Sequence, residues 1–146
     1  MALNLAPFGR WTLRDKAAQR RLALRYAFIR VIPMKYDLEG KTFRSVKNTD
    51  NGEVGADTVF CYHQSGNVVS AEYSGGAIVV GHLVANVLPS GQLDMRYHHV
   101  NREGEIMIGK CLSTPELTDN GKLLFKEKWQ WLSGDLSSGY SEIIEQ

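Results

Sequence analysis

From about Lys41 onward, short glycine-containing turn sequences recur between runs rich in Val, Ile, Tyr, Phe and Trp. Glycine-bearing turns between β-prone runs are typical of hairpins. The connections are too short for the crossovers that parallel strands need, so consecutive strands are expected to be antiparallel. The expected strands span residues 41–47, 57–64, 67–73, 77–87, 92–100, 105–113, 122–132 and 138–144.

A meander of about eight strands in one small domain tends to close on itself, because closure removes the exposed sheet edges. The pattern therefore predicts an all-β fold, an antiparallel up-and-down barrel of the calycin or lipocalin kind, with a strongly rolled sheet as the alternative. Gly81 and Gly109 fall inside expected strands. Glycines in such places predict bends or bulges.

Composition places the chain among ordinary globular proteins. It has 146 residues, 43% hydrophobic and 23% charged. No stretch reaches the roughly 18 apolar residues that a membrane-spanning helix needs, and no signal peptide is evident. The two cysteines, Cys61 and Cys111, are too few for a secreted disulfide framework, so two reduced thiols are favoured over a bridge. A cytoplasmic location is expected.

The net charge of +1 conceals an uneven distribution. Residues 1–33 carry seven Lys/Arg and one acid, whereas residues 34–146 carry ten bases and fifteen acids. Thr12 to Ile32 is expected to form a helix, with Thr12 as its cap, Asp15 at the capping-box position and Pro33 as its end. The predicted organisation is a basic helical N-terminal extension over 1–33, followed by a β-barrel domain over 34–146.

Glu127 is the most informative residue of the expected barrel. Side chains of a strand alternate between two faces, and Glu127 shares its face with Leu123, Phe125, Trp129 and Trp131. An unpaired charge among aromatic side chains is expensive to bury. Such a carboxylate needs a partner, a shifted pKa or a ligand. It could brace the barrel through an ion pair, anchor a ligand, act as an acid or base, or face solvent in a different register.

Arg96 is the natural ion-pair partner for Glu127. It shares a strand face with His98, whereas Tyr97 and His99 lie on the other face, which has a core-like composition. If that core-like face points inward, Arg96 points outward and cannot reach Glu127. If the barrel encloses a polar cavity, Arg96 and His98 could face inward, and the sequence leaves this register open.

The adjacent pair His98 and His99 would be an unusual metal site, because neighbouring strand residues point to opposite faces. His63 and His82 are further candidates, but the sequence has no His-x-His or Cys-x-x-Cys spacing. No metal or cofactor is therefore expected. Tyr62, Tyr73, Tyr97, Trp129 and Trp131 are core aromatics by the simplest interpretation, or the wall of an apolar ligand pocket by the second.

Several segments from Met34 onward resemble a small bacterial β-barrel family. They are Asn48 to Val54, Tyr73 to Gly76 with Gly81, Met95 to Asn101, Ser113 to Glu116, and Glu127 to Trp131 followed by Ser133-Gly134-Asp135. Some members carry the name N-acetylglutamate synthase. An acetyltransferase should show a glycine-rich loop opening a helix for the acetyl-CoA pyrophosphate, and no such segment is evident. The resemblance therefore implies a shared fold and pocket rather than a reaction. Members tend to begin near the equivalent of Met34, so residues 1–33 are expected to be a dispensable extension, with a basic arm or targeting segment as the alternative.

Small-ligand binding inside the barrel is the leading functional hypothesis. Glu127 and Arg96 would hold a polar group, with Tyr97, Trp129 and Trp131 packed around it and Tyr73, His98 and His99 as further candidates. The alternatives are a small enzyme using Glu127 with His98 or His99 as acid and base, and a structural or interaction protein. Nucleic-acid binding is disfavoured because the barrel domain is acidic, and a homo-oligomer is left open.

Overall fold

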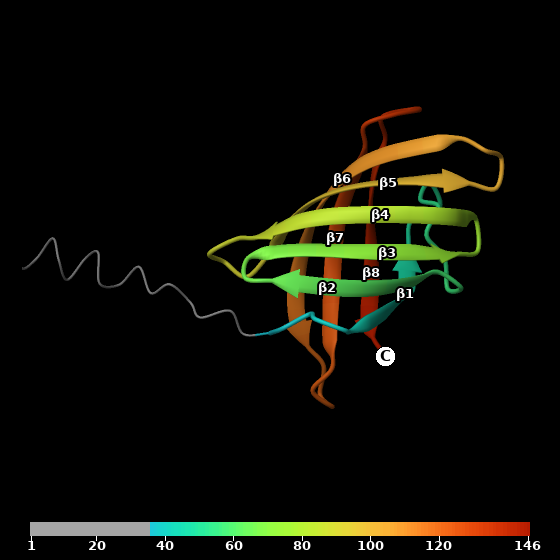
Figure 1. The fold of residues 1–146 in the computed structure, drawn as a ribbon. Helices are drawn as coiled ribbons and strands as arrows, with labels where there is room; N and C mark the ends of the chain where they lie inside the picture. The colour runs from blue at the N-terminus through green and yellow to red at the C-terminus, as the bar shows by residue number, and fades with distance from the viewer. Residues whose placement is uncertain (1–35) are drawn as a thin grey trace, which may run out of the picture. The chain divides into compact units, whose positions relative to one another are not determined.

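Eight antiparallel strands follow one another in sequence order and close into a barrel (Figure 1). The computed structural model describes residues 36–146. The strands are β1 (Thr42–Asn48), β2 (Val59–Ser65), β3 (Val68–Gly75), β4 (Ile78–Val87), β5 (Leu93–Asn101), β6 (Ile106–Leu117), β7 (Leu123–Trp131) and β8 (Ser138–Glu145). The extension over 1–33 and the helix expected from Thr12 to Ile32 lie outside the described residues.

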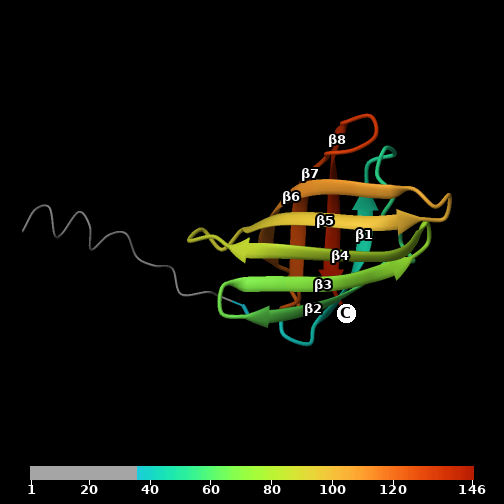
Figure 2. The same cartoon turned by 45° about the horizontal axis from the view of Figure 1, so that its top comes forward.

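The barrel closes through the first and last strands. Each strand pairs with the next, and β1 pairs with β8 from Phe43↔Glu145 to Asn48↔Ser141. In Figure 2, β3–β5 cross in front of β1, β7 and β8, so the two sides of the sheet enclose the interior. The expected all-β antiparallel meander is confirmed, and the closed barrel prevails over an open rolled sheet. Within residues 36–146, no helix has the length and apolar character of a membrane span.

The predicted strands correspond to the observed ones, with one clear extension in β6. This strand was expected to end at residue 113, but it continues through Pro115 to Leu117. Its pairing with β5 stops at Leu93↔Ser113, whereas its pairing with β7 continues to Leu117↔Leu123. A proline has no N–H to donate, so it is tolerated where one edge of the strand is unpaired.

Alternation along the strands divides the side chains between core and solvent. One end of the barrel is filled by apolar side chains that include Leu38, Phe43 and Phe125, none with any exposed surface. Tyr36 covers this end, with its ring edge-on to Phe125 and its hydroxyl donating to the Gly91 carbonyl. Burial raises the pKa of Tyr36 to about 12, so this cover stays uncharged. The opposite end, where β1 leads into β2, holds the polar interior described below.

The two glycines in the strands have a different role from the one expected. Gly109 lies in regular register with both neighbours, so the predicted bend or bulge is wrong there. In β4 the register shift lies at Val79 and Val80, just before Gly81. A Cβ on Gly81 would stand 2.4 Å from Cζ of Tyr73, and one on Gly109 would stand 2.2 Å from Cζ of Tyr97. Each glycine therefore makes room for a tyrosine ring from the adjacent strand.

A third pair of this kind was not anticipated from the sequence. Trp129 is paired with Gly139 across β7 and β8, and a Cβ on Gly139 would lie 2.4 Å from Cζ2 of the indole. All three rings thus lie against the inner wall of the barrel over a residue without a side chain. The rings consequently fill less of the barrel interior than rings that project towards the barrel axis would.

Candidate functional site

A cavity of about 50 Å³ lies inside the barrel, at the end covered by the β1–β2 connection. Its volume suits a few water molecules, since one needs roughly 10–15 Å³. Six of the eight predicted site residues line it: Glu127, Tyr73, Tyr97, His99, Trp129 and Trp131. Sequence reasoning did not anticipate the contributions of Asn48, Glu53 and Ser141, which also line it.

Two serine hydroxyls hold Glu127 deep in the barrel. Ser113 donates to Oε1 at 3.1 Å and Ser141 donates to Oε2 at 2.8 Å. The sheet register explains the arrangement, because Ser113 of β6 and Ser141 of β8 flank Glu127 of β7 at the same level. Burial raises the pKa of Glu127, and the two hydroxyl hydrogen bonds oppose that rise. The side chain is nevertheless only partly covered, since it faces the cavity.

Arg96 and His98 do not belong to this site. Arg96 lies on the outer surface of β5, where it forms an ion pair with Asp94 at 2.7 Å and donates to the Met95 carbonyl. The expected pair between Arg96 and Glu127 is not formed, because the core-like face with Tyr97 and His99 points inward. His98 is exposed and lies against His82 on the outer wall, with ring centroids 5.8 Å apart.

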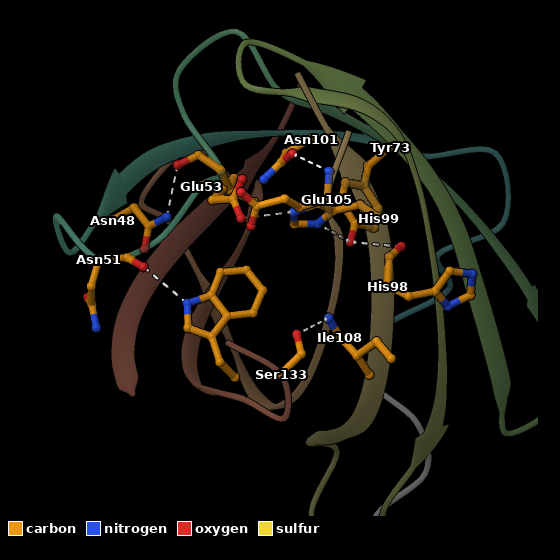
Figure 3. Close-up of polar contacts among 12 residues, drawn as sticks. Asn48, Asn51, Glu53, Tyr73, His98, His99, Asn101, Glu105, Ile108 and Ser133 are labelled. Atoms are coloured by element: carbon orange, nitrogen blue, oxygen red, sulfur yellow. Dashed lines mark hydrogen bonds and ion pairs between the residues drawn. The ribbon is translucent and has the colours of Figure 1, made fainter. Parts of the chain in front are cut away.

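His99 is the histidine that faces the interior, and its side chain is 1% exposed. Its Nδ1 lies 3.0 Å from the Tyr73 hydroxyl, which also donates to the His98 carbonyl at 3.3 Å. Its Nε2 has no hydrogen-bond partner among residues 36–146 and faces Oε1 of Glu53 at 3.6 Å. Figure 3 shows Glu53 pointing towards His99 from across the mouth of the cavity. Burial lowers the pKa of His99, and the nearby Glu53 carboxylate opposes this shift.

The β1–β2 connection, residues 49–58, is tied to the barrel by the two buried tryptophans. Trp131 donates its indole N–H to the Asn51 carbonyl at 3.1 Å, and Trp129 donates to Oδ1 of Asn48 at 3.2 Å. Asn48 in turn donates to the Val54 carbonyl at 2.8 Å. A buried indole N–H usually donates a hydrogen bond. The two tryptophans in the sequence of β7 therefore already indicated that acceptors had to lie nearby. We refer to residues 49–58 as the mouth loop.

Asn48→Ala should loosen the mouth loop without unfolding the barrel. The change removes the acceptor of Trp129 and the donor to Val54, leaving a buried indole N–H unpaired at a cost of about 1–3 kcal/mol. Hydrogen exchange of residues 49–58 should accelerate more than exchange in β3 and β4. Asn86→Ala, at an exposed position of β4, is the matched control and should leave both regions unchanged. Uniform acceleration through the barrel would contradict a local role for Asn48.

Glu127 and His99 line the same cavity but have different partners. Glu127 hydrogen-bonds the two serines, whereas His99 contacts Tyr73 and faces Glu53, and no hydrogen bond joins Glu127 to a histidine of residues 36–146. Among residues 36–146, no three metal-binding side chains converge. Cys61 is exposed and Cys111 is buried, and both are free thiols. Burial raises the pKa of the Cys111 thiol, which keeps it protonated.

These features define a closed, eight-stranded antiparallel barrel of calycin-like architecture, with a cavity that contains a carboxylate. Residues 36–146 match the family model described as "Avidin-like protein", and the chain belongs to this family. No curated protein and no solved structure gives a significant match. The small β-barrel family expected from the sequence motifs is thereby supported, whereas the name N-acetylglutamate synthase has no counterpart in the comparison.

Proposed function

We propose that this protein binds a small molecule inside the barrel, with Glu127 as the polar anchor. The observation that carries the proposal is a carboxylate that faces a cavity and has two hydroxyl partners, with no cationic side chain from residues 36–146 in the lining. An apolar pocket with a few convergent polar groups and a perturbed pKa is the usual form of a ligand site. Membership of the avidin-like family supports small-ligand binding in general terms.

The aromatic side chains provide the walls of this proposed site. Tyr97 and Trp131 meet edge to face at 5.8 Å between centroids, and Trp129 lies 5.5 Å from Trp131. Rigid rings bury much apolar ligand surface at a small cost in conformational entropy. Tyr73 is held by His99 and stacks on Phe60 at 4.9 Å, so this side of the site is preorganised.

The mouth loop is the natural gate. The cavity volume of about 50 Å³ is far below the roughly 300–1,000 Å³ of ordinary ligand pockets. A ligand of more than a few atoms therefore has to displace part of the mouth loop. Such a displacement would break the hydrogen bonds from Trp131 to Asn51 and from Asn48 to Val54, and move Glu53 away from His99. These contacts, like those of Asn51 with Ser138 and of Thr49 with Tyr140, are polar and confined to one end of the barrel, which suits a segment that opens.

Ligand binding should shift the NMR signals of the side chains that line the cavity. We would first examine the purified full chain by native mass spectrometry for a co-purified molecule. We would then titrate it with a panel of neutral, anionic and cationic fragments, including biotin because the family is named after avidin. At least one compound should shift the indole N–H signals of Trp129 and Trp131 in a saturable manner.

The exposed Tyr140, on the outer face of β8, provides the internal reference. Its ring signals should stay unchanged while those of the two tryptophans move. The proposal fails if no compound shifts the cavity signals, or if the shifts occur only on the outer wall around Tyr140 and Arg96. Either outcome would favour a role for the outer surface of the barrel.

A further inference from the structure

Among the described residues 36–146, the charged side chains that line the cavity are acidic. They are two carboxylates, Glu127 in the interior and Glu53 at the mouth, and this part of the chain adds no lysine or arginine to the lining. His99 is the basic side chain that these residues contribute, and burial lowers its pKa, which favours the neutral form. The basic side chains next to Glu127 in sequence, Lys126 and Lys128, are exposed on the outer face. Within residues 36–146, no lysine or arginine of the cavity lining therefore supplies a counter-charge for the interior carboxylate.

The described residues use only half of the hydrogen-bonding capacity of Glu127. A carboxylate accepts about four hydrogen bonds, and the two that the structure shows come from Ser113 and Ser141. A ligand that brings N–H donors can use the remaining positions. A ligand that brings a carboxylate or phosphate would place like charges together in a buried site, which is unfavourable.

The aromatic lining favours the same class of ligand. The cavity is bordered by the aromatic side chains of Phe60, Tyr73, Tyr97, Trp129 and Trp131. The faces of aromatic rings carry partial negative charge and attract cations, by about 0.5–2 kcal/mol and most strongly where water is excluded. A carboxylate among aromatic rings therefore selects positive charge through two independent effects.

Resting on the small-ligand function proposed above, we infer that the ligand is a small organic cation with a protonated amine. Its ammonium group donates to Glu127, and its apolar part packs against Tyr97 and Trp129. Glu53 adds negative charge at the mouth, which favours the approach of a cation. The small volume of the cavity, about 50 Å³, limits the part of the ligand that enters to a short or flat group, unless the mouth loop opens.

A series of matched compounds tests this inference on the full chain. The probes are n-butylamine, 1-butanol and butyrate, with benzylamine, benzyl alcohol and benzoate as larger equivalents. Within each set the size is nearly constant while the charge changes from positive to neutral to negative. Dissociation constants are measured at neutral pH from the indole signals of Trp129 and Trp131. The amine of at least one set should bind about tenfold more tightly than its alcohol, and the carboxylate should bind most weakly.

Two variants test whether Glu127 causes the preference for the amine over the alcohol. Glu127→Gln keeps the shape of the side chain and removes its charge, so the amine should lose its advantage while alcohol binding persists. Glu116→Gln removes an exposed carboxylate of β6, beside Lys126 on the outer face, and should leave the advantage intact. If Glu127→Gln does not fold, the comparison of amine, alcohol and carboxylate binding to the wild type still tests the inference.

The outcomes separate this inference from the broader function. If alcohols or carboxylates bind the cavity as tightly as the amines, the cation inference is overturned while small-ligand binding stands. The same conclusion follows if the preference for the amine survives in Glu127→Gln, or if only other neutral or anionic fragments bind. If nothing in the wider fragment panel reaches the cavity either, both proposals fail together.

Discussion

Replacing Gly81 with alanine should destabilise the barrel by about 2 kcal/mol, in the range found for overpacked cores. The new Cβ would stand 2.4 Å from Cζ of Tyr73 and 2.5 Å from its Cε2, well inside van der Waals contact. The usual gain from replacing glycine, a lower entropy of the unfolded chain, is only about 0.4–1 kcal/mol. The clash therefore dominates.

Tyr73 has little freedom to move away from such a clash. Its ring is 3% exposed, stacks on Phe60, and contacts His99 through its hydroxyl. Any displacement breaks the hydrogen bond with His99 or pushes the ring into the cavity. Gly109→Ala should cost less, because its opposing ring, that of Tyr97, is only partly buried.

Thermal and urea unfolding would test this order. Gly81→Ala should lower Tm by about 10 °C, Gly109→Ala should lower it by less, and Gly55→Ala should leave it unchanged or raise it slightly. Gly55 is the matched control, because a Cβ there has nothing within 4 Å. Equal stability of Gly81→Ala and Gly55→Ala would show that the Tyr73 ring moves freely, contrary to the packing described above.

The ligand-free barrel should lose stability as pH rises above the ordinary pKa of glutamate, and Glu127→Gln should remove much of that loss. Burial raises the pKa of Glu127 above its ordinary value of 4.5. Between 4.5 and the raised value, the folded chain holds a proton that the unfolded chain has released. The free energy of unfolding then falls with pH by up to about 1.4 kcal/mol per pH unit. The stabilisation is complete below the ordinary pKa and is lost as pH rises through the folded-state pKa.

Other groups contribute with the opposite sign. The pKa of His99 is lowered mainly by burial, so its contribution is present above its ordinary pKa of 6.5 and is lost as pH falls. The pKa of Glu145 is lowered by its hydrogen bonds to the Leu123 N–H and to Lys41, so its contribution is present above 4.5 and is lost in acid. Both proteins contain these other groups. Subtracting the free energy of unfolding of Glu127→Gln from that of the wild type therefore cancels their contributions to first order and leaves the contribution of Glu127.

Urea unfolding from pH 4 to pH 8 would measure that difference. The wild type should lose stability relative to Glu127→Gln as pH rises above 4.5. Glu116→Gln is again the control and should follow the wild-type curve. Parallel curves for the wild type and Glu127→Gln across this range would mean that Glu127 ionises normally despite its position.

The strands were predictable because the signals that specify them are local. Alternation of apolar residues identifies the buried face of β7 without any knowledge of its neighbours, and glycine-bearing turns mark where each hairpin reverses. The extension of β6 through Pro115 was missed for the same reason. Whether a proline is tolerated depends on which edge of the strand is paired, and that is a property of the sheet.

The site was predictable in part. Six of the eight candidate side chains line the cavity, because they lie on inward faces that the alternation already distinguishes. Arg96 was proposed from charge alone. It lies on the outer surface because it is next to the inward-pointing Tyr97 in β5, and neighbouring strand residues point to opposite faces. The actual partners of Glu127, Ser113 and Ser141, are distant in sequence and have no local pattern that marks them.

By itself, the sequence determined the all-β antiparallel class, the approximate strand limits and the aromatic strand face that Glu127 shares. These follow from side-chain periodicity and turn chemistry, which act over a few residues. Only the tertiary structure decided that the sheet closes, that hydroxyls rather than Arg96 hold the carboxylate, and that glycines 81, 109 and 139 accommodate aromatic rings. Each of these depends on cross-strand register and on long-range pairing such as β1 with β8, which juxtaposes residues about a hundred positions apart.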